Sequence, residues 1–406
     1  MIDFEKWIPN TDWVPQFDLV TGKTSKPAFR LEINNKDISG KIQSRLISLT
    51  LTDNRGLESD QLDIELDDAD GMLSLPRRGD ILTLELGWDD HPLTSKGKFV
   101  VDEIEHVGAP DRLTIRARST DFRGDLNVKR EFSYHKQTLE NIVSTIATRN
   151  QLKFKISEEL KGISMHIDQT NESDVSFLTR IAKQEGAIAS VKNGELLFVR
   201  QGQNKTASGQ DIPPVLIIRQ SGDNHRFSLS DREAYTSVVA QWQDTRIATK
   251  QTVKLKRVES KSGKVEIIVE YRSSESKSLG KNAYQKDKNK TTTAQQESAS
   301  YLTGTQENVL TLSRIYSNKE NAERAAKAVW EKVQRGAAQF SITLAKGRAD
   351  VYPETPIQLK DFKPEIDGIH WTLVKVTHNL NDSGFTTSLD LEIKIDDVEI
   401  KTEIPK

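Results

Sequence analysis

The sequence predicts an α+β protein that is mainly β, with two similar small β-barrel domains and, between them, an α/β domain and a further β-rich domain. Two observations support this fold class. Apolar and polar residues alternate in many short segments, which is typical of half-buried strands. In addition, one pattern occurs twice: Phe99–His106 resembles Trp371–His378, and each segment begins with an aromatic residue and places an aliphatic residue two positions before a histidine.

The similarity extends beyond these two segments. Each follows an extended segment introduced by proline, Pro76–Leu82 in one case and Pro353–Leu359 in the other. When the two histidines are aligned, Leu113 falls opposite Phe385 without a gap. The spacing therefore predicts two β domains of one design. A chain that carries one module twice can build a ring whose local symmetry is double its subunit count.

Composition limits the classes of protein that this chain can be. A length of 406 residues predicts two to four domains. Hydrophobic residues are only 35% and charged residues 29%, which favours an extended β-rich protein completed by oligomer contacts. A net charge of −2 gives no reason to expect nucleic acid binding. Cysteine is absent, so a disulfide framework, a thiolate zinc site and a cysteine nucleophile are excluded.

The sequence also bears on where the protein is made. The N-terminus has no basic region followed by an apolar stretch, and no long apolar run occurs elsewhere. We therefore expect synthesis in the cytoplasm and no stable membrane insertion.

Changes of pattern divide the chain into six predicted segments. In the first, tryptophan and proline are interspersed among polar residues, which fits either an extended arm on another surface or a tail packed on its own domain. The segments are the N-terminal arm (1–26), the first β-barrel domain (27–129), the small α/β domain (130–202), the β-rich domain (203–316), the helix with the second β-barrel domain (317–400) and an exposed tail (401–406).

The first β-barrel domain is predicted from strands that alternate apolar and polar residues. Turn-forming residues separate these strands, for example at Asn54–Gly56 and Ala109–Asp111. Short antiparallel strands at this density are typical of a barrel or a sandwich. The predicted strands are 47–51, 62–66, 82–88, 99–106 and 113–117.

The α/β domain is predicted from two amphipathic helices and a hairpin. Thr138 is the expected N-cap of the first helix and Asp174 that of the second, which Gly186 should end. Their apolar residues recur at helical spacing. Asn193–Gly194 lies between two apolar runs and predicts a two-residue β-turn.

The β-rich domain and the helix after it are less regular in sequence. A tract from 273 to 300 is rich in Lys, Ser, Thr and Gln and is predicted to be a mobile loop. Ser317 and Glu320 predict a capping box for a long helix that Gly336 ends. The second β module should run from 339 to 395. Strands are also expected at 215–218, 237–242 and 265–271.

Two motifs that suggest ligand binding fail when their positions are counted. Asp67–Gly71 resembles part of a calcium loop, but Leu66 and Arg77 stand at the first and last ligand positions. Lys261–Lys264 lacks the upstream glycine of a phosphate-binding loop, and Val265 stands where Ser or Thr should hold magnesium. We interpret both segments as turns.

The histidines and carboxylates give no constellation for catalysis. Only His106 and His378 occupy matching positions; they could share a metal site, although a histidine that satisfies a local backbone group is commoner. Adjacent acids such as Asp102 and Glu103 point to opposite faces of a strand, so they do not form facing carboxylates. We predict no enzyme activity and no catalytic, cofactor-binding or metal-binding residues. The histidines are His91, His106, His135, His166, His225, His370 and His378.

Many short runs, taken in order, resemble the phage late-control D protein family. The resemblance is dense from about 27 to 202 and resumes from about 317 to 391. No single motif is sufficient, but the ordered set is specific. The runs include Arg45–Gly56, Leu62–Asp68, Leu86–Trp88, Val101–His106, Arg116–Arg123 and His166–Asp174.

This resemblance implies the central hub of a contractile tail baseplate, related to the hub of T-even phages and to the N-terminal part of VgrG. Such hubs are trimers in which two β-barrel domains per subunit form a pseudo-sixfold ring. The implied partners are two further copies, the central spike protein, the hexameric tail tube protein, and other baseplate and tape-measure proteins. The implied location is the baseplate of a virion or tailocin particle.

The sequence departs from the family pattern at both ends. The arm before Pro27 is longer than expected. After the second module there is no OB-fold and no glycine–valine repeat of a spike, so we expect the spike to be a separate protein. This favours a phage or tailocin over a full-length secretion-system VgrG.

Three other functions were weighed against the hub. A tail-associated cell-wall hydrolase would need converging carboxylates, or a metal site that includes His106 or His378. The hub of a type VI-like secretion apparatus is a second alternative. A carbohydrate-binding surface protein would bind sugar through Trp7, Trp13 and Trp88, but we expect Trp88 to pack at the edge of the first module.

Overall fold

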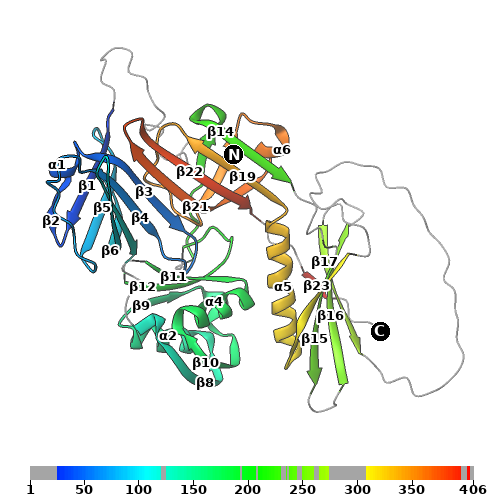
Figure 1. The fold of residues 1–406 in the computed structure, drawn as a ribbon. Helices are drawn as coiled ribbons and strands as arrows, with labels where there is room; N and C mark the ends of the chain where they lie inside the picture. Colours follow the sequence, from blue (N-terminus) through cyan, green and yellow to red (C-terminus); the bar gives the residue numbers. More distant parts are fainter. Residues whose placement is uncertain are drawn as a thin grey trace, which may run out of the picture.

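The computed structural model of the 406-residue chain shows mostly strands, with few helices (Figure 1). Except for residues 25 and 26, the predicted arm lies outside the described residues. The turn Lys261–Lys264 and, after Ser273, the predicted mobile tract also lie outside them. The structure describes residues 25–119, 125–192, 194–206, 209–229, 235, 237–244, 249–259, 265–273, 308–394 and 400–402.

The first module is a curled sheet with the strand order β1-β5-β6-β7-β4-β3 (Figure 1). Its alternating leucines point into one core, as predicted; Leu49, Leu51 and Leu62, for example, are all at most 1% exposed. All five predicted strands are present. The strands are β1 (Pro27–Ile33), β3 (Leu46–Asn54), β4 (Gln61–Asp67), β5 (Ile81–Trp88), β6 (Thr94–Val107) and β7 (Arg112–Ser119), with β2 (Lys36–Asp37) and α1 (Ser39–Ile42) after β1.

The second module has the corresponding strand order, β13-β20-β21-β22-β19-β14. Its core centres on Trp371 and Phe340, which lie 5.7 Å apart between ring centroids and are at most 1% exposed. The elements are β13 (Val215–Ile218), β14 (Gly222–Leu229), β19 (Ala338–Leu344), β20 (Pro356–Lys360), β21 (His370–Asn381) and β22 (Gly384–Ile393), with a 3-10 turn, η5 (Arg219–Ser221), and the short helix α6 (Pro364–Asp367).

The predicted fold class is confirmed, and the structure adds that the two modules share one continuous 13-stranded sheet. One predicted boundary is wrong: β13 and β14 fall within the predicted β-rich domain (203–316) but pair with β20 and β19 of the second module. Sequence periodicity does not reveal this pairing, because β14 is largely exposed and polar and its partner β19 lies more than a hundred residues later.

The α/β domain encloses its helices α2 and α4 between two small sheets (Figure 1). The predicted apolar faces of both helices are buried there, together with Phe198 and Val191. The elements are η4 (Asp125–Asn127), β8 (Lys129–Thr138), α2 (Leu139–Arg149), β9 (Lys153–Ile156), α3 (Glu158–Lys161), β10 (Ser164–Ser173), α4 (Asp174–Glu185), β11 (Ala187–Lys192) and β12 (Glu195–Arg200).

A five-stranded sheet has the order β18-β15-β16-β17-β23. Its strands β15 to β18 are inserted between β14 and β19 of the second module, and β23 follows β22. The long helix α5 packs on this sheet through Ala322, Ala326 and Trp330. The prediction that this helix belongs to the second β-barrel domain is therefore wrong. The predicted exposed tail begins inside β23. The elements are β15 (Ser237–Asp244), β16 (Thr249–Glu259), β17 (Val265–Ser273), β18 (Val309–Tyr316), α5 (Lys319–Arg335) and β23 (Ile400–Thr402).

The helix ends show which local predictions were right. Thr138 caps α2 by accepting a hydrogen bond from Asn141 N, and Gly186 ends α4 in the left-handed conformation, both as predicted. Ser173, rather than Asp174, caps α4. The predicted capping box of α5 is also wrong, because Asn318 supplies the cap. In both wrong cases an adjacent residue could accept the same bond.

Candidate functional site: the junction between the two modules

The two modules bend at equivalent positions. When β6 pairs with β7, one extra residue is left between Val101 and Glu103; when β21 pairs with β22, one is left between Leu373 and Lys375. In each case the bulge begins five residues before the histidine of the repeated segment. A bulge bends and twists its strand. The two copies of the pattern noticed in the sequence therefore have the same local geometry.

A second bulge also occurs at equivalent positions in the two modules, in β3 and in β14. In the pairing of β3 with β4 the irregularity lies between Leu46 and Ser48, and in the pairing of β14 with β19 it lies between Gly222 and Asn224. These bulges fix a correspondence between β3 and β14. Leu51 and Phe227 stand at equivalent positions, each five residues after the first residue of its bulge.

The turn before β5 in the first module and the turn before β20 in the second module match as well. Gly79 N donates to Val101 O, and Glu354 N donates to Leu373 O, both at 2.8 Å. Gly79 has a φ of 101° and Glu354 a φ of 71°. Sequence alignment missed this correspondence, since it paired Pro76 with Pro353, and a glutamate in the left-handed region is not recognisable from its residue type.

The gapless alignment beyond the histidines is wrong. His106 pairs with Leu113, whereas His378 pairs with Thr387, so Leu113 corresponds to Thr387 and not to Phe385. The second hairpin is longer because its ladder continues to the pair of Asn381 and Gly384.

The two modules are joined by strand pairing between β21 and β3. The ladder is antiparallel and runs from the pair of Lys375 and Asn54 to the pair of Asn381 and Ser48. Within the second module, β20 pairs only with the first residues of β21, 370–372. The remainder of that edge is therefore available to β3. This ladder makes the two modules one sheet.

Apolar packing fills the junction on the inner face of the ladder. Phe385 is 1% exposed, and its ring centroid lies 5.8 Å from that of Trp88 and 5.9 Å from that of His378. Trp88 donates through Nε1 to Gly347 O at 2.9 Å. Trp88 thus lies at the end of β5, in the first module, and packs on the second module, which accords with its predicted packing role.

The two matching histidines occupy different environments. His378 is fully buried beside Thr387, its Nδ1 3.0 Å from Thr387 Oγ1, and burial lowers its pKa well below the ordinary value. The side chain of His106 is 39% exposed, and its Nε2 lies 3.3 Å from Asp68 Oδ2. The structure does not bring the two histidines together into the shared metal site that was considered.

A buried ion cluster lies at the base of the junction. Arg55, in the turn after β3, contacts Glu354 at 2.6 Å and Glu392 at 2.5 Å. Arg335, from the end of α5, lies 3.7 Å from Glu392, and Gly202 N donates to Glu354 at 3.1 Å. Burial raises the pKa of Glu354, while Arg55 opposes that rise; burial also lowers the pKa of Arg335. The cluster connects both modules, α5 and the α/β domain.

A second ion group connects the α/β domain to the first module. Lys192 of β11 pairs with Asp53 at 3.0 Å and also with Asp60. Burial raises the pKa of Asp60, attraction to Lys192 lowers it and repulsion from Asp53 raises it again; the net pKa is about 6. For Lys192 itself, burial lowers the pKa, but the two carboxylates outweigh that effect and the net shift is upward.

Asp60 gives a testable dependence of stability on pH. Its pKa rises from 3.8 to about 6 on folding, so its contribution to stability is fully present below pH 3.8 and is lost as pH rises towards 6. The expected loss is about 3 kcal/mol. Denaturant unfolding of the wild type and Asp60→Asn at pH values from 4 to 7 checks this. The wild type should lose stability relative to the variant over that range, and a constant difference would contradict the prediction.

Gly347 lies against the ring of Phe385, which gives a prediction about close packing. A Cβ at position 347 would lie 2.6 Å from a ring carbon of Phe385. Gly347→Ala is therefore expected to destabilise the protein by about 1–3 kcal/mol. The same change in a Phe385→Leu background should cost less, because the ring is gone. Equal costs in both backgrounds, measured by denaturant unfolding, would show that this contact does not matter.

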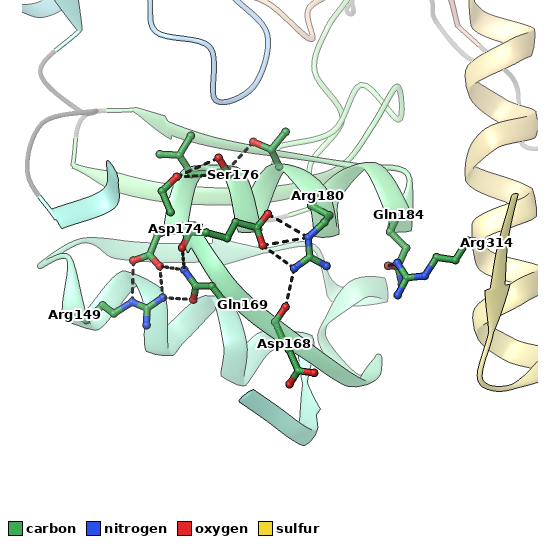
Figure 2. Close-up of polar contacts among 12 residues, drawn as sticks. Arg149, Asp168, Gln169, Asp174, Ser176, Arg180, Gln184 and Arg314 are labelled. Atoms are coloured by element: carbon green, nitrogen blue, oxygen red, sulfur yellow. Dashed lines mark hydrogen bonds and ion pairs between the residues drawn. The ribbon is translucent and has the colours of Figure 1, made fainter. Parts of the chain in front are cut away.

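Figure 2 shows a network around a buried carboxylate in the α/β domain. Asp174 is fully buried and accepts hydrogen bonds from Arg149, from Gln169 Nε2 at 2.8 Å and from Asn150 Nδ2 at 2.9 Å. Arg149 also donates to Gln169 Oε1 at 3.0 Å. The network ties β10 to α2 and α4. Both oxygens of Asp174 are thus engaged in holding the domain together.

Two further polar contacts of the α/β domain involve Arg180 and the pair of His135 and His166. Arg180 holds Glu172 and donates to Asp168 O at 2.8 Å (Figure 2). His135 and His166 face each other across β8 and β10, with their Nδ1 atoms 3.1 Å apart. Sequence periodicity does not predict this pair, because α2, β9 and α3 lie between the two strands in the chain.

In the parts of the chain that the structure describes, no group of three or more His, Asp or Glu side chains is placed to hold a metal ion. None of the described helices is long and apolar enough to cross a bilayer.

Comparison with known proteins identifies the family. A model for phage tail baseplate hub (GPD) proteins matches residues 54–384. The probable baseplate hub proteins of Escherichia phages 186 and P2 are 51% and 50% identical, and each alignment covers 94% of this chain and 97% of the relative. The 43 kDa tail protein of prophage MuSo2 from Shewanella oneidensis shares the fold, with a TM-score of 0.57 at 14% identity over 90% of this chain and 98% of its own. The chain therefore belongs to the phage tail baseplate hub (GPD) family, and its role is that of a structural baseplate hub in a phage tail.

Proposed function

We propose that three copies of this chain form a ring of six modules that joins the hexameric tail tube to the trimeric central spike. The observation that supports this most strongly is the repeated geometry of the modules. The same strand order, the same two bulges and the same turn, before β5 or β20, occur in each. Two equivalent modules in each of three chains offer six similar positions to a sixfold tube, while the whole ring keeps threefold symmetry for the spike.

The junction supports a mechanical role for the hub. When the sheath contracts, the hub travels with the tube and the spike, and it transmits force during penetration of the envelope. A ring under load needs subunit and module contacts that do not slide. The β21–β3 ladder sets a fixed register, and Arg55, bound to Glu354 and Glu392, holds the two modules together at the end of that ladder.

The proposed partners follow from this position. They are the tube protein on the sixfold side, the spike protein on the threefold side, and other baseplate and tape-measure proteins around them. The particle is a phage virion or a tailocin, assembled after synthesis in the host cytoplasm. The protein acts without catalysis, and a hub of a type VI-like apparatus is the alternative within the same structural class.

The oligomeric mass of the purified protein, with and without co-expressed spike protein, tests the proposed function. We expect a mass of three chains alone and a complex of three chains with one spike trimer after co-expression. A protein that stays monomeric at micromolar concentration and does not bind its spike would contradict the proposal. Release of peptidoglycan fragments by the isolated chain would favour the hydrolase instead.

A further inference from the structure

We propose that the ring is closed by strand pairing between copies, in which β6 of one copy pairs antiparallel with β14 of the next. In the proposed register, Ile104 lies opposite Leu229 and His106 lies opposite Phe227. The inference rests on the proposed function, because it names the surfaces through which copies of the chain meet. It treats the β21–β3 junction within one chain as the template for the contact between two chains.

Each chain has two strand edges that correspond to this junction. On the edge of β6 that faces β5, pairing ends at Val100, and the last backbone bonds of that edge join Val101 to Asp80 and to Gly79. From Glu103 to Val107, β6 pairs only with β7 among the described strands. At the other end of the continuous sheet, β14 pairs only with β19 among those strands. Figure 1 shows β6 and β14 on opposite sides of the fused sheet.

These two edges are the counterparts of the two strands that meet in the junction. β21 is equivalent to β6, and it uses the corresponding part of its edge, from Lys375 onward, to pair with β3. β3 is equivalent to β14, and it uses the edge away from β4. Among the described strands, each copy therefore has one unpaired edge of each kind. Contacts between unlike edges are head-to-tail, and such contacts generate a ring when the rotation closes.

The bulges fix the register of the proposed ladder. In the junction His378 lies opposite Leu51. His106 is equivalent to His378, and Phe227 is equivalent to Leu51, because each pair is the same number of residues from its bulge. His106 must then lie opposite Phe227. The remaining proposed pairs follow by alternation: Ile104 with Leu229, Glu105 with Ser228, and Val107 with Arg226.

The side chains along the two edges suit this register. In the junction, the inward-facing His378 and Leu51 are at most 1% exposed. The equivalent inward positions on the open edges carry Ile104, Phe227 and Leu229, and Leu229 is 51% exposed in the single chain. An unpaired strand edge with exposed apolar side chains is a template for pairing with another chain. Pairing would bury these side chains as Leu51 and His378 are buried now.

The outward-facing side chains add charge complementarity. Glu103 and Glu105 are exposed on β6, and Arg226 is exposed on β14. In the proposed register Arg226 lies opposite Val107 and diagonal to Glu105, within reach of a long side chain. A shift by one residue would move the apolar set of each strand to the opposite face, so the pattern favours this register over its neighbours.

Cysteine cross-linking tests the inference directly, because the natural chain has no cysteine. Two double variants place cysteines at proposed outward pairs: Glu105→Cys with Ser228→Cys, and Val107→Cys with Arg226→Cys. Directly opposite residues on adjacent strands can lie within the Cα distance that a disulfide requires. After mild oxidation of the assembled full-length protein, we expect at least one of the two variants to run mainly as covalent trimer on a non-reducing gel.

Two control variants make the result interpretable. Thr52→Cys with Thr377→Cys places cysteines at the equivalent pair inside the chain, where the structure shows the two residues opposite each other; it should oxidise without any increase in mass. Glu105→Cys with Phe227→Cys places its cysteines on opposite faces of the proposed ladder and should give little covalent trimer.

The outcomes separate this inference from the proposed function. If the wild type has the mass of three chains and the internal control oxidises, but neither test pair links chains, the β6–β14 contact is refuted while the trimer stands. Stronger linking by the opposite-face control than by both test pairs would refute the register. A wild type that is monomeric both alone and with its spike would refute the proposed function and the β6–β14 contact together.

Discussion

Replacing Arg55 with methionine is expected to lower the free energy of unfolding by about 3–5 kcal/mol. The arginine lies between Glu354 and Glu392, and its side chain is only 11% exposed. Methionine keeps much of the apolar stem but leaves two buried carboxylates with less positive charge nearby. Denaturant unfolding at a fixed protein concentration measures the loss.

An exposed arginine provides a matched control that separates the effect of burial from the effect of removing one charge. Arg112 pairs with Glu65 at 3.2 Å, but its side chain is 51% exposed. Arg112→Met should therefore change the free energy of unfolding by less than about 1 kcal/mol. If Arg55→Met and Arg112→Met cost the same, the cluster would not hold the modules together as we describe.

Removing the carboxylate of Asp174 should have an effect of similar size. Asp174→Ala leaves the guanidinium of Arg149 and the amide of Gln169 without their main acceptor in a buried site (Figure 2). The expected loss is about 3–5 kcal/mol in the free energy of unfolding. Thermal or denaturant unfolding, followed by circular dichroism, measures it.

The double variant shows whether the loss comes from the broken pair. Asp174→Leu combined with Arg149→Met removes both charges of this pair, so the double variant should be more stable than Asp174→Leu alone. A double variant that loses the sum of the two single losses would contradict the account of the network, because independent sites add.

Local sequence signals predicted local structure well. The glycine in the turn after Val191 and Lys192 sets up the β11–β12 hairpin, and Gly186 ends α4 in a conformation that favours glycine. These features depend on residues a few positions apart. The repeated pattern that ends in His106 and His378 could be recognised for the same reason: in each copy, all of its residues lie within one strand.

Long-range pairing could not be predicted in the same way. β14 presents exposed polar residues such as Asn224 and Arg226 because, among the described strands, only one of its edges is paired; its sequence therefore gives a weak strand signal. The ion cluster is similar: Arg55 looked like a turn residue and Glu354 like part of an extended segment. Only the pairing of β21 with β3 brings them together.

Electron cryo-microscopy of the assembled hub, at a resolution that traces its strands, tests the central claim most directly. We expect three chains in a ring of six modules, in which β21–β3 contacts within chains alternate with β6–β14 contacts between chains. His106 should lie opposite Phe227 in each of the latter. A ring with another number of modules, or a hub in which the β6 edge from Glu103 to Val107 faces solvent, would contradict the claim.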